Sequence, residues 1–301
     1  MSLRYHTLDV FTDKAFGGNP LAVVFGGEAL GTAQMQRLAR EFNLSETVFV
    51  LPPTRSEALH RLRIFTPAVE LPFAGHPTIG TACLLAELGL TGDRATGAAD
   101  RRFMLEESIG LVPVTVRLRA GEPTYAELTT AQPPEFRSAP DAAVIAPLLG
   151  LEASDIGSEG ELPRAASCGA PYVLVPLRSP ELLAAIDFDA AATRRALAGQ
   201  WARQLYVYAR GYEGELRARM FAPELGVFED PATGSAAVAL AGALASEAAS
   251  DGEYAWTIHQ GLEMNRPSVL QTFAERRDGG VGAVRVGGCS VRIGEGLLHV
   301  G

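Results

Sequence analysis

Residues 229–245 read EDPATGSAAVALAGALA and residues 74–88 read AGHPTIGTACLLAEL, two apolar runs that each begin with a short loop containing glycine and proline. Small and apolar residues cover nearly the whole circumference of a helix in each run, instead of one face. A helix that is apolar on all sides must be buried. Because strand-like segments flank both runs, we expect one helix near 76–89 and one near 232–249, each wrapped by strands.

Other short segments also occur twice. GNPLAVV at 18–24 matches GAPYVLV at 169–175, and RLRIFTP at 61–67 matches RARMFAP at 217–223. Similar segments in the same order and at similar offsets indicate an internal repeat. We therefore expect two related domains. The predicted boundaries are an N-terminal domain over 1–130, whose sheet the C-terminal segment could complete, a linker rich in proline, alanine and glycine over 131–162, and a C-terminal domain over 163–301.

Composition excludes several classes of function. The 301 residues carry a net charge of −9, which argues against nucleic acid as a partner because phosphate binding needs a basic surface. Lys14 is the only lysine and is not in a Walker A loop, so a P-loop is excluded and a pyridoxal phosphate site is improbable. No apolar stretch approaches the roughly 20 residues of a membrane span. Without a recognisable signal peptide, we expect a cytoplasmic protein with no membrane partner.

The two loops before the helical runs are candidate anion sites. A helix start leaves backbone N–H groups without partners and carries partial positive charge. Gly75 and Gly80 in the first loop, and Gly234 and Ser235 in the second, are small enough for an anion to approach these groups. If the two domains are related by a pseudo-twofold axis, both helix starts can face one cleft that suits a small carboxylate. The alternative interpretation is that both loops are ordinary N-caps.

The chain resembles the phenazine-biosynthesis isomerase (PhzF-like) family, within the diaminopimelate-epimerase-like fold. The segments that carry the resemblance are DVFTDKAFGGNPLAVVF at 9–25, NLSETVFV at 43–50, RIFTPAVELPFAGHPTIGTA at 63–82 and FEDPATGSAA at 228–237. The resemblance implies an α+β fold of two pseudo-symmetric domains, each a barrel-like, mostly antiparallel sheet around a central buried helix. It also implies a homodimer that uses no metal and no organic cofactor.

The resemblance further implies which residues form the site. Glu46 of the S-E-T motif corresponds to the acid/base, and His76 and Asp230 to its catalytic partners. Independently, Glu46 precedes the apolar run 47–51, and a carboxyl group beside apolar side chains holds its proton more tightly, which suits proton transfer. The expected substrate-binding residues lie in the two helix-start loops: Gly75, Pro77, Thr78, Thr233, Gly234 and Ser235.

The expected function is a cofactor-independent isomerisation, in which Glu46 moves a proton on a small carboxylated metabolite, cyclic or bearing an amino or hydroxyl group. Two alternatives stay open. The first is a non-catalytic protein that binds a small anion on the same fold. The second is an amino-acid racemase or epimerase, which in this fold uses two thiols at the helix starts. Cys83, Cys168 and Cys289 lie elsewhere in the sequence, so the second alternative is the weaker.

Overall fold

The computed structural model describes residues 1–91, 100–158, 160–211 and 214–300. The chain forms two compact units. Unit 1 consists of residues 1–131 and 286–301, and unit 2 consists of residues 132–285. No helix in the described part of the chain is long and apolar enough to cross a membrane.

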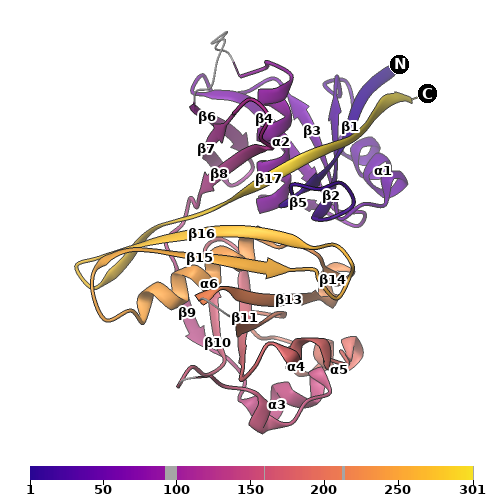
Figure 1. Cartoon of the computed structure of the whole chain (residues 1–301). Helices are drawn as coiled ribbons and strands as arrows, with labels where there is room; N and C mark the ends of the chain where they lie inside the picture. Colours follow the sequence, from indigo (N-terminus) through magenta and orange to yellow (C-terminus); the bar gives the residue numbers. More distant parts are fainter. Residues whose placement is uncertain (92–99, 159, 212–213, 301) are drawn as a thin grey trace. The chain divides into compact units, whose positions relative to one another are not determined.

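The described residues of unit 1 form the following elements before the chain enters unit 2. They are β1 (Ser2–Val10), β2 (Asn19–Phe25), α1 (Thr32–Phe42), β3 (Glu46–Leu51), β4 (Ala58–Phe65), β5 (Glu70–Leu71), α2 (Gly75–Glu87), β6 (Asp100–Glu107), β7 (Gly110–Arg117) and β8 (Thr124–Thr129). The final strand β17 (Gly280–His299) begins in unit 2 and ends in unit 1, where it pairs with β1 from Ser2 to Val10 (Figure 1).

The strands of unit 1 close into a ring. Pairing runs from β1 through β2, β3, β4, β6, β7 and β8 to β17, which returns to β1. The β2–β3 and β4–β6 pairs are parallel. The antiparallel pairs are β1–β2, β1–β17, β3–β4, β6–β7 and β7–β8. A closed ring leaves no free sheet edge for another chain to pair with. The result is the barrel-like, mostly antiparallel sheet that the family resemblance implied.

Helix α2 is the core of this unit. Every residue from Gly75 to Ala86 is buried, and the helix packs against β1, β2, β3, β7 and β8. Close packing requires a glycine in the second turn, because a Cβ atom at Gly80 would lie only 2.6 Å from Cγ2 of Val10 and 2.7 Å from Cδ2 of Leu21. The prediction of a helix buried on all sides is confirmed here.

Several elements among the described residues of unit 2 are short. The described elements are β9 (Glu135–Ser138), α3 (Ala142–Ile145), the 3-10 helices η1 (Ala146–Leu149) and η2 (Ala153–Asp155), β10 (Arg164–Ser167), β11 (Pro171–Leu177), α4 (Glu181–Ala184), α5 (Ala190–Ala196), β12 (Gln204–Arg210), β13 (Leu216–Ala222), the 3-10 helix η4 (Pro223–Leu225), β14 (Val227–Asp230), α6 (Gly234–Ser246), β15 (Gly252–Gln260) and β16 (Ser268–Arg277). Its strands pair in the order β9, β10, β11, β12, β13, β15 and β16, and β14 also pairs with β13.

Helix α6 has the same place in unit 2 that α2 has in unit 1. Its residues from Ala236 to Ala245 are buried, and it packs against β10, β11, β15 and β16. Its mostly small side chains let strands approach closely, and a Cβ atom at Gly242 would lie 2.8 Å from Cγ of Pro134. The second helix that the sequence predicted, near 232–249, is therefore also present and buried.

The expected linker over 131–162 is not a linker. Residues 132–162 contain β9, α3, η1 and η2 and belong to unit 2, so this unit begins about thirty residues before the predicted boundary at 163 and ends at 285 rather than 301. Ile145 and Leu149 are fully buried and pack in one core cluster with strands β11 and β12. The prolines and glycines of this segment lie between short helices and strands and do not form a flexible linker.

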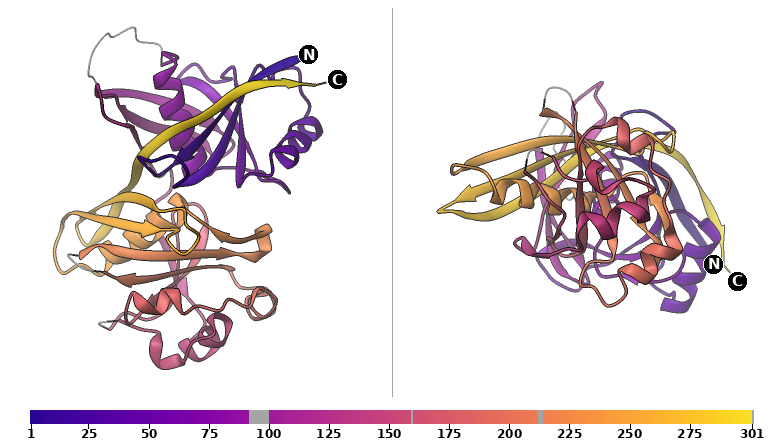
Figure 2. Two further views of the ribbon diagram at one scale, coloured as in Figure 1. Left: turned by 45° about the vertical axis from the view of Figure 1, so that its right-hand side comes forward. Right: turned by 90° about the horizontal axis from the view of Figure 1, so that it is seen from below.

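The two ends of the chain lie side by side in unit 1. The amino group of Met1 donates a hydrogen bond to the carbonyl oxygen of Val300 at 2.9 Å, and β1 and β17 run antiparallel beside each other in all views (Figure 2). The C-terminal segment thereby supplies one strand of the unit 1 barrel.

Candidate active site

Glu46 and His76 come together at one end of the unit 1 barrel. Glu46 is the first residue of β3 and pairs across to Leu21 of β2, while His76 is the second residue of α2. Nε2 of His76 lies 3.2 Å from Oε2 of Glu46, and the two side chains are only 5% and 15% exposed. The start of β3 and the start of α2 thus bring together the two residues that the resemblance implied for the site.

Burial determines the charge of His76. It lowers the pKa of His76 to about 3, so the imidazole is neutral at pH 7 even with a carboxyl group beside it. A neutral imidazole has one N–H and one lone pair. Nε2 therefore offers the carboxyl group of Glu46 either an N–H or a lone pair, although the contact of 3.2 Å lacks hydrogen-bond geometry in this structure.

The first turn of α2 has an unusual start. Its N-cap is Ala74, which has no side chain capable of capping, and Pro77 has no N–H to satisfy. The N–H of Thr78 bonds to the carbonyl oxygen of Ala74. The N–H groups of Gly75 and His76 have no acceptor within the helix, as in any first turn, and no capping side chain covers them. A first turn without a side-chain cap is the kind of helix start at which anions bind.

Thr78, which we expected to bind substrate, is fully buried and its hydroxyl group is already engaged. Its Oγ1 lies 2.7 Å from the carbonyl oxygen of Ala74 and 2.6 Å from Oε1 of Glu107. Glu107 is the last residue of β6, and its burial raises its pKa to about 8. The sequence gave no reason to single out Glu107, because its relation to α2 depends on the pairing of distant strands.

The second group of expected site residues lies in unit 2. Asp230 is the last residue of β14 and Thr233 is the N-cap of α6. Oγ1 of Thr233 donates to Oδ2 of Asp230 at 2.5 Å and makes no capping bond to the helix. As in unit 1, the helix start has no side-chain cap. The N–H groups of Gly234 and Ser235 in the first turn of α6 are therefore the unit 2 counterpart of those of Gly75 and His76.

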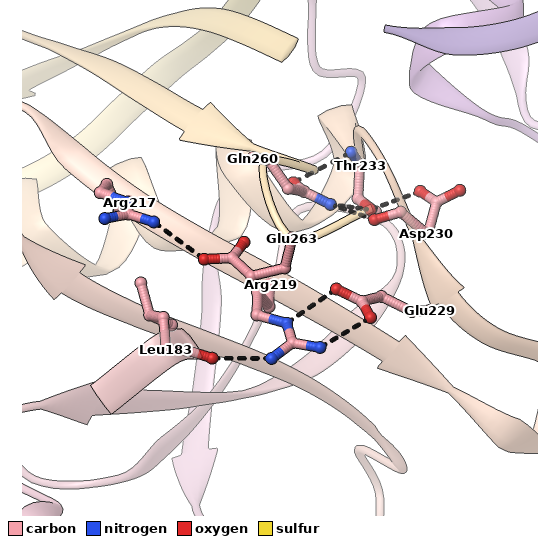
Figure 3. A network of polar contacts seen from close by, with 8 residues as sticks. All are labelled: Leu183, Arg217, Arg219, Glu229, Asp230, Thr233, Gln260 and Glu263. Atoms are coloured by element: carbon pink, nitrogen blue, oxygen red, sulfur yellow. Dashed lines mark hydrogen bonds and ion pairs between the residues drawn. The ribbon is translucent and has the colours of Figure 1, made fainter. Parts of the chain in front are cut away.

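Two residues that sequence analysis missed hold this loop in place. Gln260, at the end of β15, donates from Nε2 to the carbonyl oxygen of Asp230 at 2.8 Å and to Oγ1 of Thr233 at 3.0 Å (Figure 3). Its Oε1 accepts from the N–H of Thr233 and from the hydroxyl group of Tyr206, each at 3.2 Å. A fully satisfied buried network of this kind rigidifies the groups it joins.

Further contacts fix the strand and the helix next to this loop. Arg219 forms a bidentate pair with Glu229, at 2.8 Å to each carboxylate oxygen, and donates to the carbonyl oxygen of Leu183 at 2.7 Å (Figure 3). Because Glu229 precedes Asp230 on β14, this buried pair anchors the strand at the point where it delivers Asp230. On the helix side, Oγ of Ser235 lies 2.7 Å from the hydroxyl oxygen of Tyr172.

Replacing Gln260 with leucine is expected to lower the free energy of unfolding by about 2–4 kcal/mol, because the change leaves several buried polar groups without partners. Chemical denaturation would measure this loss. Gln271→Leu is the matched control, since Gln271 is exposed on β16 and the same substitution there should change stability by less than about 0.5 kcal/mol. Equal stability of Gln260→Leu and the wild type would contradict the role given to this network.

The three cysteines argue against the two-thiol racemase alternative. Cys83 lies in the third turn of α2 and Cys168 follows β10, so neither is at a helix start. Burial raises the pKa of Cys83 far above that of a free thiol, that of Cys168 to about 12, and also that of Cys289. A thiol that stays protonated is a poor base.

The described residues also contain no cluster of three or more histidine, cysteine and acidic side chains that could hold a metal ion.

Comparison with known proteins gives consistent matches. The model of the phenazine biosynthesis-like (PhzC-PhzF) family matches residues 8–296. An uncharacterized isomerase of Mesorhizobium japonicum is 42% identical over 99% of this chain and 99% of that protein. Trans-2,3-dihydro-3-hydroxyanthranilate isomerase of Pseudomonas aeruginosa is 38% identical over 99% of each chain. A phenazine biosynthesis protein of the PhzF family from Bacillus anthracis has a similar fold, with a TM-score of 0.87 over 100% of both chains at 24% identity.

Proposed function

Because the chain belongs to the phenazine biosynthesis-like (PhzC-PhzF) family and is an isomerase of that family, we propose that Glu46 is its acid/base and moves a proton within a small carboxylated metabolite. The observation that carries this proposal is the contact of 3.2 Å between Glu46 and the buried, neutral His76. No other histidine and carboxylate pair in the described residues has both side chains so well shielded from solvent.

In the proposed reaction, the ionised carboxylate of Glu46 takes a proton from a carbon atom of the substrate. One oxygen receives this proton while Oε2 stays in contact with Nε2 of His76. The C–H bond electrons move into the conjugated system of the substrate, and Glu46 then returns the proton to a different carbon atom. The product has the same composition as the substrate, and the enzyme ends in its starting protonation state. Acid/base catalysis of this kind requires no redox partner.

The helix starts supply the binding groups. We propose that the N–H groups of Gly75 and His76 hold the negative charge that develops on the substrate when the proton leaves, because a helix start favours an anion. In unit 2, we propose that the N–H groups of Gly234 and Ser235 bind a carboxylate in the same way. Asp230, an acceptor fixed by Thr233, suits an amino or hydroxyl group of that substrate.

The proposed substrate class is a small cyclic carboxylate that carries an amino or hydroxyl group. It is supported by the relative from Pseudomonas aeruginosa, which acts on trans-2,3-dihydro-3-hydroxyanthranilate and matches this chain along its whole length.

A homodimer is a further part of the proposal, and analytical ultracentrifugation of the full chain would test it.

The test is carbon-bound hydrogen exchange. The protein is incubated in D2O with trans-2,3-dihydro-3-hydroxyanthranilate, and proton NMR follows the C–H signals. We expect conversion to an isomer, with deuterium at one carbon atom to the extent that the proton on Glu46 exchanges with solvent before it is returned. Binding of this compound with a measurable Kd, with neither isomerisation nor exchange at any carbon atom, would contradict the proposal and favour the non-catalytic anion-binding alternative. If the compound does not bind, related amino- and hydroxy-substituted cyclic carboxylates are tested in the same way, and failure of all of them to isomerise or exchange would also contradict it.

A further inference from the structure

Glu107 is a buried carboxyl group that the proposed reaction does not use. It ends β6, its residue is 4% exposed, and its Oε1 lies 2.6 Å from Oγ1 of Thr78 in the first turn of α2. The other carboxyl oxygen, Oε2, is buried and has no hydrogen-bond partner among the described residues. A carboxylate in such a place would have an uncompensated charge, whereas a neutral carboxylic acid needs only one partner for its hydroxyl group.

The hydrogen-bond count at Thr78 leads to the same protonation state. Its hydroxyl group lies within hydrogen-bond distance of the carbonyl oxygen of Ala74, at 2.7 Å, and of Glu107. A carbonyl oxygen can only accept, and a hydroxyl group has one proton to give. If Thr78 gives that proton to Ala74, the contact with Glu107 is satisfied only when the carboxyl group of Glu107 donates. The contacts therefore form a directed chain from Glu107 through Thr78 to Ala74.

A second contact joins the segment after Glu107 to the start of α2. The backbone N–H of Ile109, in the turn between β6 and β7, donates to the carbonyl oxygen of Pro72 at 3.1 Å. Pro72 lies two residues before Ala74, and Thr78 lies four residues after it. The end of β6 and the turn after it thus contact the chain on both sides of the N-cap of α2, at Pro72 and at Thr78. His76 lies between these two residues in the sequence.

We propose that Glu107 is a positioning residue of the site, which in its protonated form fixes the first turn of α2 through Thr78 and thereby sets the contact between His76 and Glu46. This inference rests on the proposed function for its catalytic consequence, but not for its structural one. Burial also raises the pKa of Glu107 to about 8, which agrees with a neutral acid at pH 7.

Four variants test the chain of contacts. Thr78→Val keeps the shape of the side chain and removes the hydroxyl group, and Glu107→Leu removes the carboxyl group. Glu107→Gln keeps a donor toward Thr78 and cannot ionise. Thr81→Val is the matched control, because Thr81 lies in the same helix, is fully buried, and its hydroxyl group has no partner among the described residues. All four variants are compared as full-length proteins after circular dichroism has shown that they fold.

The first readout does not depend on a substrate. Long-range nitrogen–proton NMR spectra report the tautomer and environment of the His76 imidazole, and a His76→Asn variant assigns its signals among the five histidines. We expect the His76 nitrogen signals to shift in Thr78→Val and Glu107→Leu, and to stay in place in Glu107→Gln and Thr81→Val. Unchanged signals in both Thr78→Val and Glu107→Leu would overturn the proposal.

The second readout is the isomerase assay. We expect kcat to fall at least ~10-fold in Thr78→Val and Glu107→Leu, since small displacements of catalytic groups are costly, with a smaller effect on KM. Glu107→Gln should recover most of that loss, and Thr81→Val should keep the wild-type rate. A loss in Glu107→Gln as large as in Glu107→Leu would overturn the proposal, because it would mean that the ionised form is needed. A different outcome separates the two proposals. If the His76 signals shift in Thr78→Val and Glu107→Leu but the wild-type protein isomerises none of the compounds, the proposed function is refuted and the positioning role is supported.

Discussion

Glu46→Gln is expected to reduce isomerase turnover by about 10³-fold, because general acid/base groups contribute 10²–10⁴-fold and Glu46 would serve both proton transfers. The amide has nearly the size of the carboxyl group, and the oxygen of the amide can still accept from Nε2 of His76, so the contact of 3.2 Å has a chemical equivalent in the variant. What the variant cannot do is take up a proton. Substrate binding, measured by isothermal titration calorimetry, should therefore change far less than kcat.

The matched control is Glu28→Gln, which makes the same chemical change at an exposed glutamate of unit 1. It should leave both the rate and the D2O exchange unchanged. If Glu46→Gln still exchanges carbon-bound hydrogen at the wild-type rate, another group is the base and the assignment of Glu46 is wrong. If Glu46→Gln loses binding together with turnover, Glu46 acts in binding and the comparison of kcat with Kd would show it.

Local sequence patterns predicted the helices well. The runs near 76–89 and 232–249 became α2 and α6, because an all-round apolar pattern has only one stable environment, the inside of a sheet. The pattern also located Glu46 at the start of a strand and His76 in the first turn of a helix. Their contact at 3.2 Å depends on how α2 packs against β3, which no local pattern specifies.

Features that depend on distant pairings were missed. Gln260 is separated from Asp230 by thirty residues and from Tyr206 by fifty-four, and nothing in the sequence around it distinguishes it from other strand residues. Glu107 likewise meets Thr78 across 29 residues of sequence, and its place follows from the pairing of β6 with β4. The linker prediction failed for a different reason. Proline and glycine mark the ends of elements, and over 131–162 they mark the ends of several short ones.

The contribution of Glu107 to the stability of the protein is expected to fall as pH rises from about 5 to 8. Its pKa is raised by burial from 4.5 to about 8, so between these values the folded chain holds a proton there that the unfolded chain has released. Stability falls with pH wherever the native state binds more protons than the unfolded state. The contribution is complete below pH 4.5, declines by up to about 1.4 kcal/mol per pH unit, and is lost once pH passes about 8.

Comparison with Glu107→Gln isolates this contribution, because the amide does not titrate and all other groups cancel in the difference. Chemical denaturation of both proteins from pH 5 to pH 9 should show nearly equal stability at pH 5, an advantage of the variant that grows with pH, and a plateau above about pH 8. His76 acts in the opposite direction. Its pKa is lowered by burial from 6.5 to about 3, so its contribution is present above pH 6.5 and lost as pH falls toward 3. A difference between the two proteins that stays constant from pH 5 to pH 9 would mean that Glu107 ionises in the folded chain at no cost, and its hydroxyl group could then not be the donor that holds Thr78.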